Sequence, residues 1–358
     1  MAPRFDLIVV GAGPAGVATA ILCAKRGARV MLVDGSLRPR RKIGETLAPG
    51  TQALMERMGL WQSLPLSSLR ISHGNCSSWG EPEVRCTDFI FGGQGPGWQI
   101  AREEFEQALR EMATRQLAEV RWGVQVSRIE RNRSCWAVSS SAGPIEAGFL
   151  VDATGRTGIV AAALGIDRQF ADDLVAVSAI AIPERFGDCD GRTWIVSEPR
   201  GWWYTSLRPD GSRLVSFQTD SDLLRTEAWQ RAGWLTASLG RARAIQTLLG
   251  AYGYRCGEVG LNSSRSAKLD QLCGDDWLAV GDASMAFDPI SGFGIQHALQ
   301  AAERAVRVIL QPSAAAYRAY TDQAITIWRN YLDGKREIYG QERRWADQQF
   351  WVRRLAAK

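Results

Sequence analysis

The stretch that decides the fold is Asp6–Asp34, which reads DLIVVGAGPAGVATAILCAKRGARVMLVD. An apolar run, Leu7–Val10, leads into a glycine-rich turn, and an alanine-rich segment of helical composition follows the turn. A second apolar run, Arg29–Val33, ends on the acid Asp34. A strand, a glycine-rich turn, a helix and a second strand in this order predict a β-α-β unit that binds a dinucleotide.

The residues of the turn have separate physical tasks. Gly11 permits the tight turn, Gly13 lets the backbone approach a pyrophosphate at the helix N-terminus, and Gly16 lets helix and strand pack closely. Asp34, eighteen residues beyond Gly16, is placed to accept the hydroxyls of an adenine nucleotide's ribose. The predicted nucleotide ligands in this unit are Gly11, Gly13, Pro14, Ala15, Gly16 and Asp34.

A membrane helix or a signal segment is the competing interpretation of this stretch, because Leu7–Ala24 is eighteen residues without a charge. Three glycines and Pro14 interrupt it, Asp6 precedes it, and no A-x-A cleavage pattern follows it. We therefore interpret it as a buried strand and helix and expect no membrane span.

The composition is that of a folded globular protein with one large domain or two closely packed domains: 358 residues, 46% hydrophobic and 23% charged. The net charge of +5 is too diffuse to indicate a nucleic-acid partner. The seven cysteines form no C-x-x-C pair, and His73 and His297 are the only histidines, so we predict no metal site. We interpret the cysteines as reduced, structural thiols of a cytoplasmic protein.

A basic loop, Arg38–Lys42, follows Asp34 and precedes Gly44-Glu45-Thr46-Leu47 and a predicted helix at Thr51–Gly59. Such a run is usually a solvated loop, but beside a dinucleotide site Arg41 can contact phosphate. A second glycine cluster at 92–97 lacks the G-x-G-x-x-G spacing, and we predict a flexible loop there.

Arg102 opens the next predicted helix, Glu103–Leu117, whose apolar stripe contains Phe105, Leu109 and Met112. An arginine at such a helix start points to the cofactor in folds of this type, and an exposed charge is the competing interpretation. Residues 119–152 then alternate as strands, which we predict at 120–122, 124–129, 135–139, 145–147 and 149–152. Three or four of them form an antiparallel meander that leads to Asp152-Ala153-Thr154-Gly155.

Residues 170–267 differ in pattern from the first unit. Strands are predicted at 174–182, 193–197, 202–207 and 214–219, with a hairpin turn at Arg208-Pro209-Asp210-Gly211 and helices between 222 and 252. These strands predict a second, antiparallel sheet. Trp202, Trp203 and Tyr204 are adjacent on one of them, so they cannot all face one core, and we expect at least one to face a cavity.

The chain then returns to the nucleotide-binding part. Trp277–Val280 is a predicted buried strand that ends at Gly281-Asp282. The loop Pro289-Ile290-Ser291-Gly292-Phe293-Gly294 leads into a predicted helix at 295–310, whose N-terminus offers backbone amides and a positive dipole end to an electron-rich ligand edge. The last thirty residues are predicted to be helical and to cover the core.

These separated pieces together resemble the FAD-dependent monooxygenases of the para-hydroxybenzoate hydroxylase fold. The resemblance spans residues 6–310 and is carried by the G-A-G-P-A-G turn, the Arg102 helix start, the D-A-T-G segment, and Gly281-Asp282 with the loop that follows. It implies that Asp282 contacts the ribityl or pyrophosphate part of FAD. It also implies that Pro289–Gly294 faces the pyrimidine edge of the flavin.

Within this family, Gly44-Glu45-Thr46-Leu47 and Gly201-Trp202-Trp203-Tyr204 resemble the tryptophan-halogenase branch. Halogenases need a lysine beside the substrate to capture hypohalous acid, and here no lysine occurs between Lys42 and Lys268. Their W-x-W-x-I-P signature is also absent. A closer resemblance is to halogenase-related flavoproteins that oxygenate a tryptophan within a polypeptide during quinone-cofactor maturation.

The resemblance implies an FAD-dependent monooxygenase that hydroxylates an electron-rich aromatic ring through a flavin C4a-hydroperoxide, with a peptide-borne indole as the favoured substrate. The alternatives are a halogenase, a small-molecule aromatic hydroxylase, a non-oxygenating FAD reductase and a flavin-binding protein without catalysis. Electrons come from NAD(P)H or from a partner flavin reductase.

Glu45, Asp288 and His297 are the candidate proton-transfer residues; their competing roles are bracing a loop, capping a turn and filling a helix position. The substrate-binding candidates are Trp98, Trp202, Trp203 and Tyr204. The further cofactor-binding candidates are Arg41, Glu45, Thr46, Arg102, Val126, Asp152, Ala153, Thr154, Gly155, Gly281, Asp282, Pro289, Gly292, Phe293, Gly294 and Ile295.

The predicted fold is therefore α/β: a Rossmann-like FAD-binding domain with a β-meander, an antiparallel-sheet substrate domain and C-terminal helices. We predict that the FAD-binding domain comprises 1–80, 99–169 and 268–330, that the substrate domain comprises 81–98 and 170–267, and that 331–358 is a helical segment.

Overall fold

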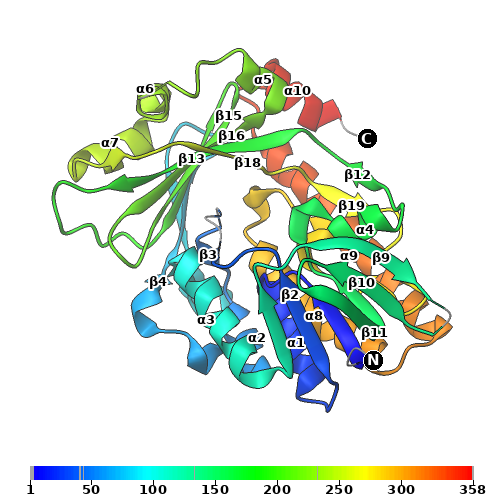
Figure 1. The fold of residues 1–358 in the computed structure, drawn as a ribbon. Coiled ribbons are helices and arrows are strands. Elements are labelled where there is room, and N and C mark those ends of the chain that lie inside the picture. Colours follow the sequence, from blue (N-terminus) through cyan, green and yellow to red (C-terminus); the bar gives the residue numbers. More distant parts are fainter. Residues whose placement is uncertain (1–3, 40–41, 43, 133, 232, 357–358) are drawn as a thin grey trace.

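The computed structural model describes residues 4–39, 42, 44–132, 134–231 and 233–356. Two large sheets lie at opposite ends of the molecule, and helices join and cover them (Figure 1). The predicted fold class is confirmed: a parallel nucleotide-binding sheet carries a meander, a second sheet is mainly antiparallel, and the chain finishes in helices.

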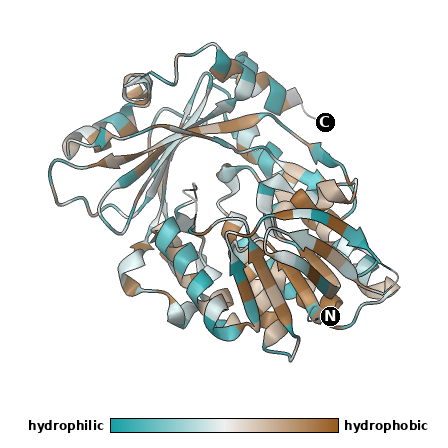
Figure 2. Cartoon of the chain, in the orientation of Figure 1, coloured by the Kyte–Doolittle hydropathy of each residue, from teal (hydrophilic) through white to brown (hydrophobic). Residues whose placement is uncertain are grey.

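The first sheet runs in the order β20-β21-β11-β1-β2-β8, and its middle strands pair in parallel. Its strands are β20 (Cys273–Gly274), β21 (Trp277–Ala279), β11 (Gly143–Asp152), β1 (Arg4–Val10), β2 (Val30–Asp34) and β8 (Glu119–Trp122). Its core strands are strongly hydrophobic in Figure 2 because both faces are covered. The covering helices include α1 (Pro14–Ala24), α3 (Arg102–Gln116) and α8 (Gly294–Leu310).

The meander has three antiparallel strands, which agrees with the predicted three or four, but the strand bounds differ. It consists of β9 (Val126–Arg131), β10 (Trp136–Ser140) and the first half of β11, which pair antiparallel in sequence order. The predicted strands at 145–147 and 149–152 are one continuous strand, β11. The strand at 119–122, β8, pairs in parallel with β2 at the sheet edge and takes no part in the meander.

The second sheet runs in the order β17-β13-β16-β15-β14-β5-β6, and β18 also pairs with β13. Its strands are β13 (Leu174–Ile182), β14 (Thr193–Glu198), β15 (Gly201–Leu207), β16 (Arg213–Asp220), β5 (Gly74–Ser78), β6 (Arg85–Asp88), β17 (Arg255–Cys256) and β18 (Gly260–Ser263). The four predicted strands are confirmed to within one or two residues, and the Arg208–Gly211 turn closes the β15–β16 hairpin. The predicted helical region contains three short helices, α5 (Ser221–Arg225), α6 (Trp234–Ser238) and α7 (Arg243–Ala251).

Smaller elements connect the two sheets. Two three-stranded sheets contain β3 (Thr46–Leu47), β7 (Gly97–Ile100) and β4 (Leu69–Ser72), and β12 (Arg168–Phe170), β19 (Ala267–Leu269) and β22 (Met285–Ala286). The remaining helices are α2 (Thr51–Met58), α4 (Ile159–Ala163), α9 (Ala314–Gln341) and α10 (Gln349–Ala356). Helix α9 starts beside the first sheet and ends beside the second (Figure 1). No helix in the described ranges combines the length and apolar character that a membrane crossing requires.

One interpretation of the cysteines is wrong. Cys76 on β5 and Cys86 on β6 form a disulfide, whereas we expected reduced thiols. The hairpin register places the two residues directly opposite each other, with their Cα atoms 4.0 Å apart. Five cysteines are free: Cys23, Cys135, Cys189, Cys256 and Cys273.

Candidate functional site

The glycine-rich turn after β1 has the geometry of a phosphate cradle. A Cβ atom on Gly11 would lie 2.3 Å from the Ala153 carbonyl oxygen, and one on Gly16 would lie 2.0 Å from the Gly11 oxygen. A Cβ on Gly13 would meet nothing within 4 Å. The first and third glycines are therefore required by packing, whereas Gly13 leaves open space at the N-terminus of α1. Pro14 and Ala15 follow as the first residues of that helix.

Asp34, at the end of β2, is held in place by three donors. Its Oδ2 accepts from the Ala12 amide at 2.8 Å, and its Oδ1 accepts from the Ser36 amide and from Arg110 Nη2, each at 2.8 Å. Arg110 is buried in α3, and its guanidinium lies over the Trp122 ring at 4.2 Å. Sequence reasoning missed Arg110. The sequence offers one indication of its role: Arg110 is a charged residue one turn after Glu106, on a helix face whose residues are buried.

Arg102 begins α3 as predicted, but its guanidinium is engaged within the protein. It donates to Glu106 Oε1 at 2.8 Å and to the Gly44 carbonyl oxygen at 3.2 Å. Burial alone would raise the pKa of Glu106, but Arg102 and Lys42 hold it below its ordinary value.

Thr46 Oγ1 donates to Gln99 Oε1 at 2.9 Å. Arg41 lies outside the described residues.

Glu45 connects the nucleotide-binding part with the second sheet. Its side chain is 3% exposed, and its Oε2 accepts from the Arg102 amide at 3.3 Å. Burial raises the pKa of Glu45 to about 7, since it outweighs the neighbouring charges of Arg208 and Arg102. Burial also raises the pKa of Tyr204 on β15, and the charge of Glu45 acts in the same direction.

In the D-A-T-G segment, Asp152 holds the loop that follows β11 through hydrogen bonds to its side chain. Asp152 is fully buried, and its Oδ1 accepts from the Thr154 amide at 3.0 Å and the Thr154 hydroxyl at 2.6 Å. Its Oδ2 accepts from the Ala161 amide at 3.0 Å. The Asp152 carboxylate therefore positions the backbone of Ala153 and Thr154. A Cβ on Gly155 would meet nothing within 4 Å, and Val126, at the start of β9, packs against the main core.

Two arginines that the sequence did not single out hold the loop around Asp282. Arg168 donates to the carbonyl oxygens of Asp282 at 2.9 Å and Ala283 at 2.5 Å. Arg156 Nε lies 3.2 Å from Asp282 Oδ2. The side chain of Asp282 is still 36% exposed, so it can contact a ligand. Gly281 packs this loop against the start of α1, because a Cβ there would lie 2.8 Å from the Cβ of Ala15.

Asp288 shapes the turn that precedes α8. It is fully buried; its Oδ1 accepts from the Ile290 amide at 3.0 Å and its Oδ2 from the Tyr339 hydroxyl at 2.9 Å. Burial raises its pKa, and Lys335, whose Nζ lies 3.6 Å from Oδ2, opposes that effect. This geometry makes Asp288 a positioning residue for the turn Pro289–Ser291. Cβ atoms on Gly292 and Gly294 would meet nothing within 4 Å, which leaves open space before the N-terminus of α8, where Phe293 and Ile295 also lie.

His297 lies in the first turn of α8, 5% exposed, with its ring against Phe287 at 4.5 Å. Its Nε2 has no hydrogen-bond partner among the described residues. Burial, with a smaller contribution from Arg304, lowers the pKa of His297 to about 3, so the imidazole is neutral at pH 7. The pKa of Glu45, about 7, suits the exchange of a proton near pH 7, whereas that of His297, about 3, does not.

The four aromatic candidates do not form one pocket. Trp202 is 1% exposed and donates its indole N–H to the Tyr339 hydroxyl at 2.9 Å, inside a cluster with Trp79 and Trp351. Trp98 donates to Gln52 and packs on Trp61.

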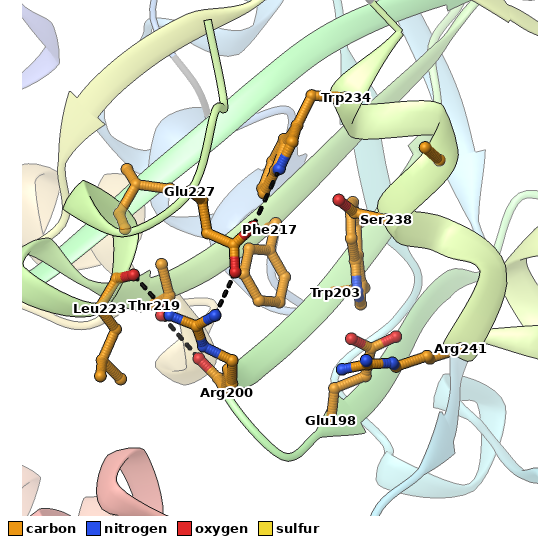
Figure 3. A pocket seen from close by; sticks show the side chains of 12 residues that line it. Glu198, Arg200, Trp203, Phe217, Thr219, Leu223, Glu227, Trp234, Ser238 and Arg241 are labelled. Atoms are coloured by element: carbon orange, nitrogen blue, oxygen red, sulfur yellow. Dashed lines mark hydrogen bonds and ion pairs between the residues drawn. The ribbon is translucent and has the colours of Figure 1, made fainter. Parts of the chain in front are cut away.

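Trp203 lies on the opposite face of β15 from Trp202, and it lines a cavity of its own (Figure 3). Half-buried Tyr204 packs with Trp202 on the same face of β15, with ring centroids 5.9 Å apart.

Comparisons with known proteins agree with this geometry. The profile of the family described as "FAD binding domain" matches residues 4–313. LodB of Marinomonas mediterranea, whose name describes it as an FAD-dependent oxidoreductase, is 28% identical over 98% of this chain and 97% of its own length.

Two solved structures share the fold. CmlS, a flavin-dependent halogenase, superposes with a TM-score of 0.86 at 23% identity and covers 98% of this chain and 68% of its own. QhpG, a peptidyl tryptophan dihydroxylase essential for tryptophylquinone cofactor biogenesis, gives a TM-score of 0.79 at 24% identity over 98% of this chain and 79% of its own. At these identities the two likenesses establish the fold alone.

Proposed function

This chain belongs to the family of proteins with an FAD binding domain, and on that premise we propose that it is a monooxygenase that hydroxylates the indole of a peptide-borne tryptophan. FAD is its cofactor, and the chain is an FAD-dependent oxidoreductase of the halogenase and monooxygenase group. The substrate and the type of oxygenation are our inference.

The hydrogen bonds of the lysines favour hydroxylation over halogenation. The resemblance implies that a halogenase of this branch keeps a lysine free beside its substrate. Each of the four described lysines is engaged elsewhere in the protein. Lys25 donates to the Met58 carbonyl, Lys42 to Glu106, Lys268 to the Leu269 carbonyl, and Lys335 to Asp172 and Ser266.

The open spaces described above fit FAD. The N-terminus of α1 at Gly13 would hold the pyrophosphate, and Asp34 would accept from the adenosine ribose. Asp282 would contact the ribityl chain, and the amides at Gly292 and Gly294 would face the flavin ring. When bound and reduced, FAD supplies the activation of molecular oxygen.

Glu45 is the residue that we assign to proton transfer. Hydroxylation of an aromatic ring replaces a C–H bond by a C–O bond, so the attacked carbon must lose a proton. A carboxylate whose pKa is about 7 takes up that proton at neutral pH and returns it afterwards. Tyr204 is the half-buried substrate-binding candidate whose pKa is raised by the charge of Glu45.

Further support comes from relatives of the same fold. QhpG acts on peptidyl tryptophan according to its description, and the second sheet of the present chain carries aromatic residues on both faces. The halogenase CmlS shares the fold equally well, so the chemical test must separate the two reactions.

The test uses the FAD-loaded protein, a tryptophan-containing peptide, oxygen, and chloride and bromide in the same reaction. One series receives NADPH, and a second receives a flavin reductase with NADH. We expect mass spectrometry to show a gain of one or two oxygen atoms on the tryptophan and no halogen. A chlorinated or brominated product would overturn the proposal, and turnover of free tryptophan alone would refute the peptide substrate.

A further inference from the structure

A cavity of about 270 Å³ lies on the face of the second sheet that carries Trp203 (Figure 3). Strands β14–β16 form its floor, and α5, α6 and the turn that follows α6 form its rim. Side chains alternate along β15, so Trp203 points into this cavity while Trp202 and Tyr204 point to the other face. The cavity therefore lies on the opposite side of the sheet from Trp202 and Tyr204.

Three aromatic side chains make the cavity suited to a ring. The rings of Trp203 and Phe217 are 4.7 Å apart, and those of Phe217 and Trp234 are 6.2 Å apart with an edge-on arrangement. Aromatic pairs of this geometry contribute about 0.5–1.5 kcal/mol beyond the area that they bury. An aromatic ligand would continue the same series of contacts.

Two buried polar atoms at the bottom of the cavity lack partners among the described residues. They are Glu198 Oε1 and Trp203 Nε1, in side chains that are 7% and 0% exposed. The indole N–H of Trp203 points towards the Glu198 carboxyl (Figure 3) and acts to lower its pKa, but the two groups do not reach the geometry of a full hydrogen bond. A buried polar group without a full hydrogen bond is unfavourable, so this pair favours a ligand that satisfies both atoms.

Three other polar side chains of the cavity, Arg200, Glu227 and Trp234, are already engaged. Arg200 pairs with Glu227 and donates to the Leu223 carbonyl at 2.6 Å, and Trp234 donates to Glu227 at 3.4 Å. The charged side chains at the cavity are two acids and two arginines, which include Arg241 at its edge. This balance disfavours an organic cation and an organic anion alike.

A single neutral hydroxyl matches both unpaired atoms, because it donates one hydrogen bond and accepts another. Water would satisfy them too, but one water needs only about 10–15 Å³ and would leave the aromatic walls without contacts. We propose that this cavity binds a small phenol, whose hydroxyl donates to Glu198 Oε1 and accepts from Trp203 Nε1 while its ring packs among Trp203, Phe217 and Trp234.

Burial raises the pKa of Glu198 to about 7, and the nearby Trp203 N–H and Arg241 charge act in the opposite direction. A carboxyl that is partly protonated at neutral pH costs less to keep buried than a full charge does. This inference does not rest on the proposed function, because a binding site on this face needs no reaction at the flavin.

The test measures binding of 4-fluorophenol and of fluorobenzene to the FAD-loaded protein by fluorine NMR. The two probes share a ring, and only the first has a hydroxyl. We expect saturable binding of 4-fluorophenol, about tenfold tighter than that of fluorobenzene, since one hydrogen bond is worth about 1.4 kcal/mol.

Trp203→Phe and Glu198→Leu should each remove that preference, whereas Glu198→Gln, which keeps an acceptor oxygen, should retain most of it. The matched control is Trp136→Phe on the meander, far from the cavity. This change removes an indole N–H that donates to the Asp276 carbonyl oxygen, and it should leave the preference for 4-fluorophenol unchanged.

A crystal soaked with 4-bromophenol then locates the ligand by the anomalous signal of bromine. We expect the peak between Trp203 and Trp234. Equal affinities for the two probes in the wild type, or a bromine peak only on the Tyr204 face of the sheet, would overturn the proposal. Thermal unfolding and FAD content show whether each variant is folded. If a variant is not folded, the bromine position in the wild-type crystal tests the proposal in its place.

Discussion

The two large sheets place their polar side chains in opposite ways. In the first sheet the strand interiors are apolar, with Ile8, Val9, Leu32 and Val33 all fully buried, and the polar residues stand in loops at the strand ends. In the second sheet, β16 is buried along its whole length and yet contains Arg213, Ser216 and Gln218. The first sheet therefore supports a ligand at its edge, as open α/β sheets do, whereas the second offers polar groups from its two faces.

The largest effect is expected at the edge of the first sheet. Gly16→Ala places a methyl group 2.0 Å from a backbone oxygen that cannot move away, so we expect no folded, FAD-containing protein. Gly13→Ala meets no atom, so the apoprotein should keep its melting temperature but lose FAD affinity. Calorimetry with and without FAD measures both. Similar behaviour of the two variants would contradict the assigned roles.

The next effect concerns Glu45, which is buried beside the start of α3. Glu45→Gln should lower the rate of product formation about a hundredfold, because general acid–base groups contribute about that factor or more. FAD content should stay constant. Since the pKa of Glu45 is about 7 and the ionised form takes up the proton, the wild-type rate should fall as pH drops through 7. A Gln variant that keeps both the rate and this pH profile would exclude Glu45 from proton transfer.

A smaller effect is expected at the hydrogen bonds that link the sheets through α9. Tyr339→Phe leaves the Trp202 indole without its acceptor and Asp288 without one donor. We expect a loss of about 1–3 kcal/mol in the free energy of unfolding, measured by urea denaturation. Tyr317→Phe removes a hydroxyl at the other end of the same helix, whose contacts at 3.2 and 3.4 Å are longer, and serves as the control. Equal losses of unfolding free energy in the two variants would show that the Tyr339 hydroxyl contributes no more to the link between the sheets than the Tyr317 hydroxyl does.

The last effect, a change in the pH dependence of stability, is expected inside the second sheet. The pKa of Glu198 in the folded protein, about 7, lies above the ordinary value of 4.5. The folded state thus holds an extra proton between these values, and wild-type stability falls as pH rises from about 5 to 7, by at most about 1.4 kcal/mol per pH unit. Glu198→Gln should lack this fall, so its stability relative to wild type should increase with pH. A constant difference between pH 5 and pH 8 would refute the raised pKa.

The same contrast explains which features the sequence could predict. The β1-α1-β2 unit was placed to within a few residues, because its glycines and apolar runs act locally. Arg110, Arg156 and Arg168 were missed, since each contacts partners at least 74 positions away. An arginine in a sequence does not reveal such a partner.

The second sheet shows the same limit. Its strand positions were predicted well, but the roles of its tryptophans were not. Alternation along β15 predicts that Trp202 and Trp203 face opposite sides. It does not predict that Tyr339 and Trp351 fill one side while the other keeps a cavity. The Cys76–Cys86 bridge was missed because it depends on the register of the β5–β6 hairpin, which the sequence pattern does not fix.

The aromatic cluster around Tyr339 has a consequence for the order in which the protein is built. Trp79 donates to the Ile338 carbonyl, 259 positions further along the chain, and Trp351 donates to the carbonyl of Glu198. Contacts between such distant residues slow folding, and domains fold as they leave the ribosome. While α9 and α10 are still being synthesised, the Trp202 face of the second sheet stays uncovered. The newly made protein therefore exposes this aromatic surface until the last residues of the chain are made, and chaperone binding should concentrate there.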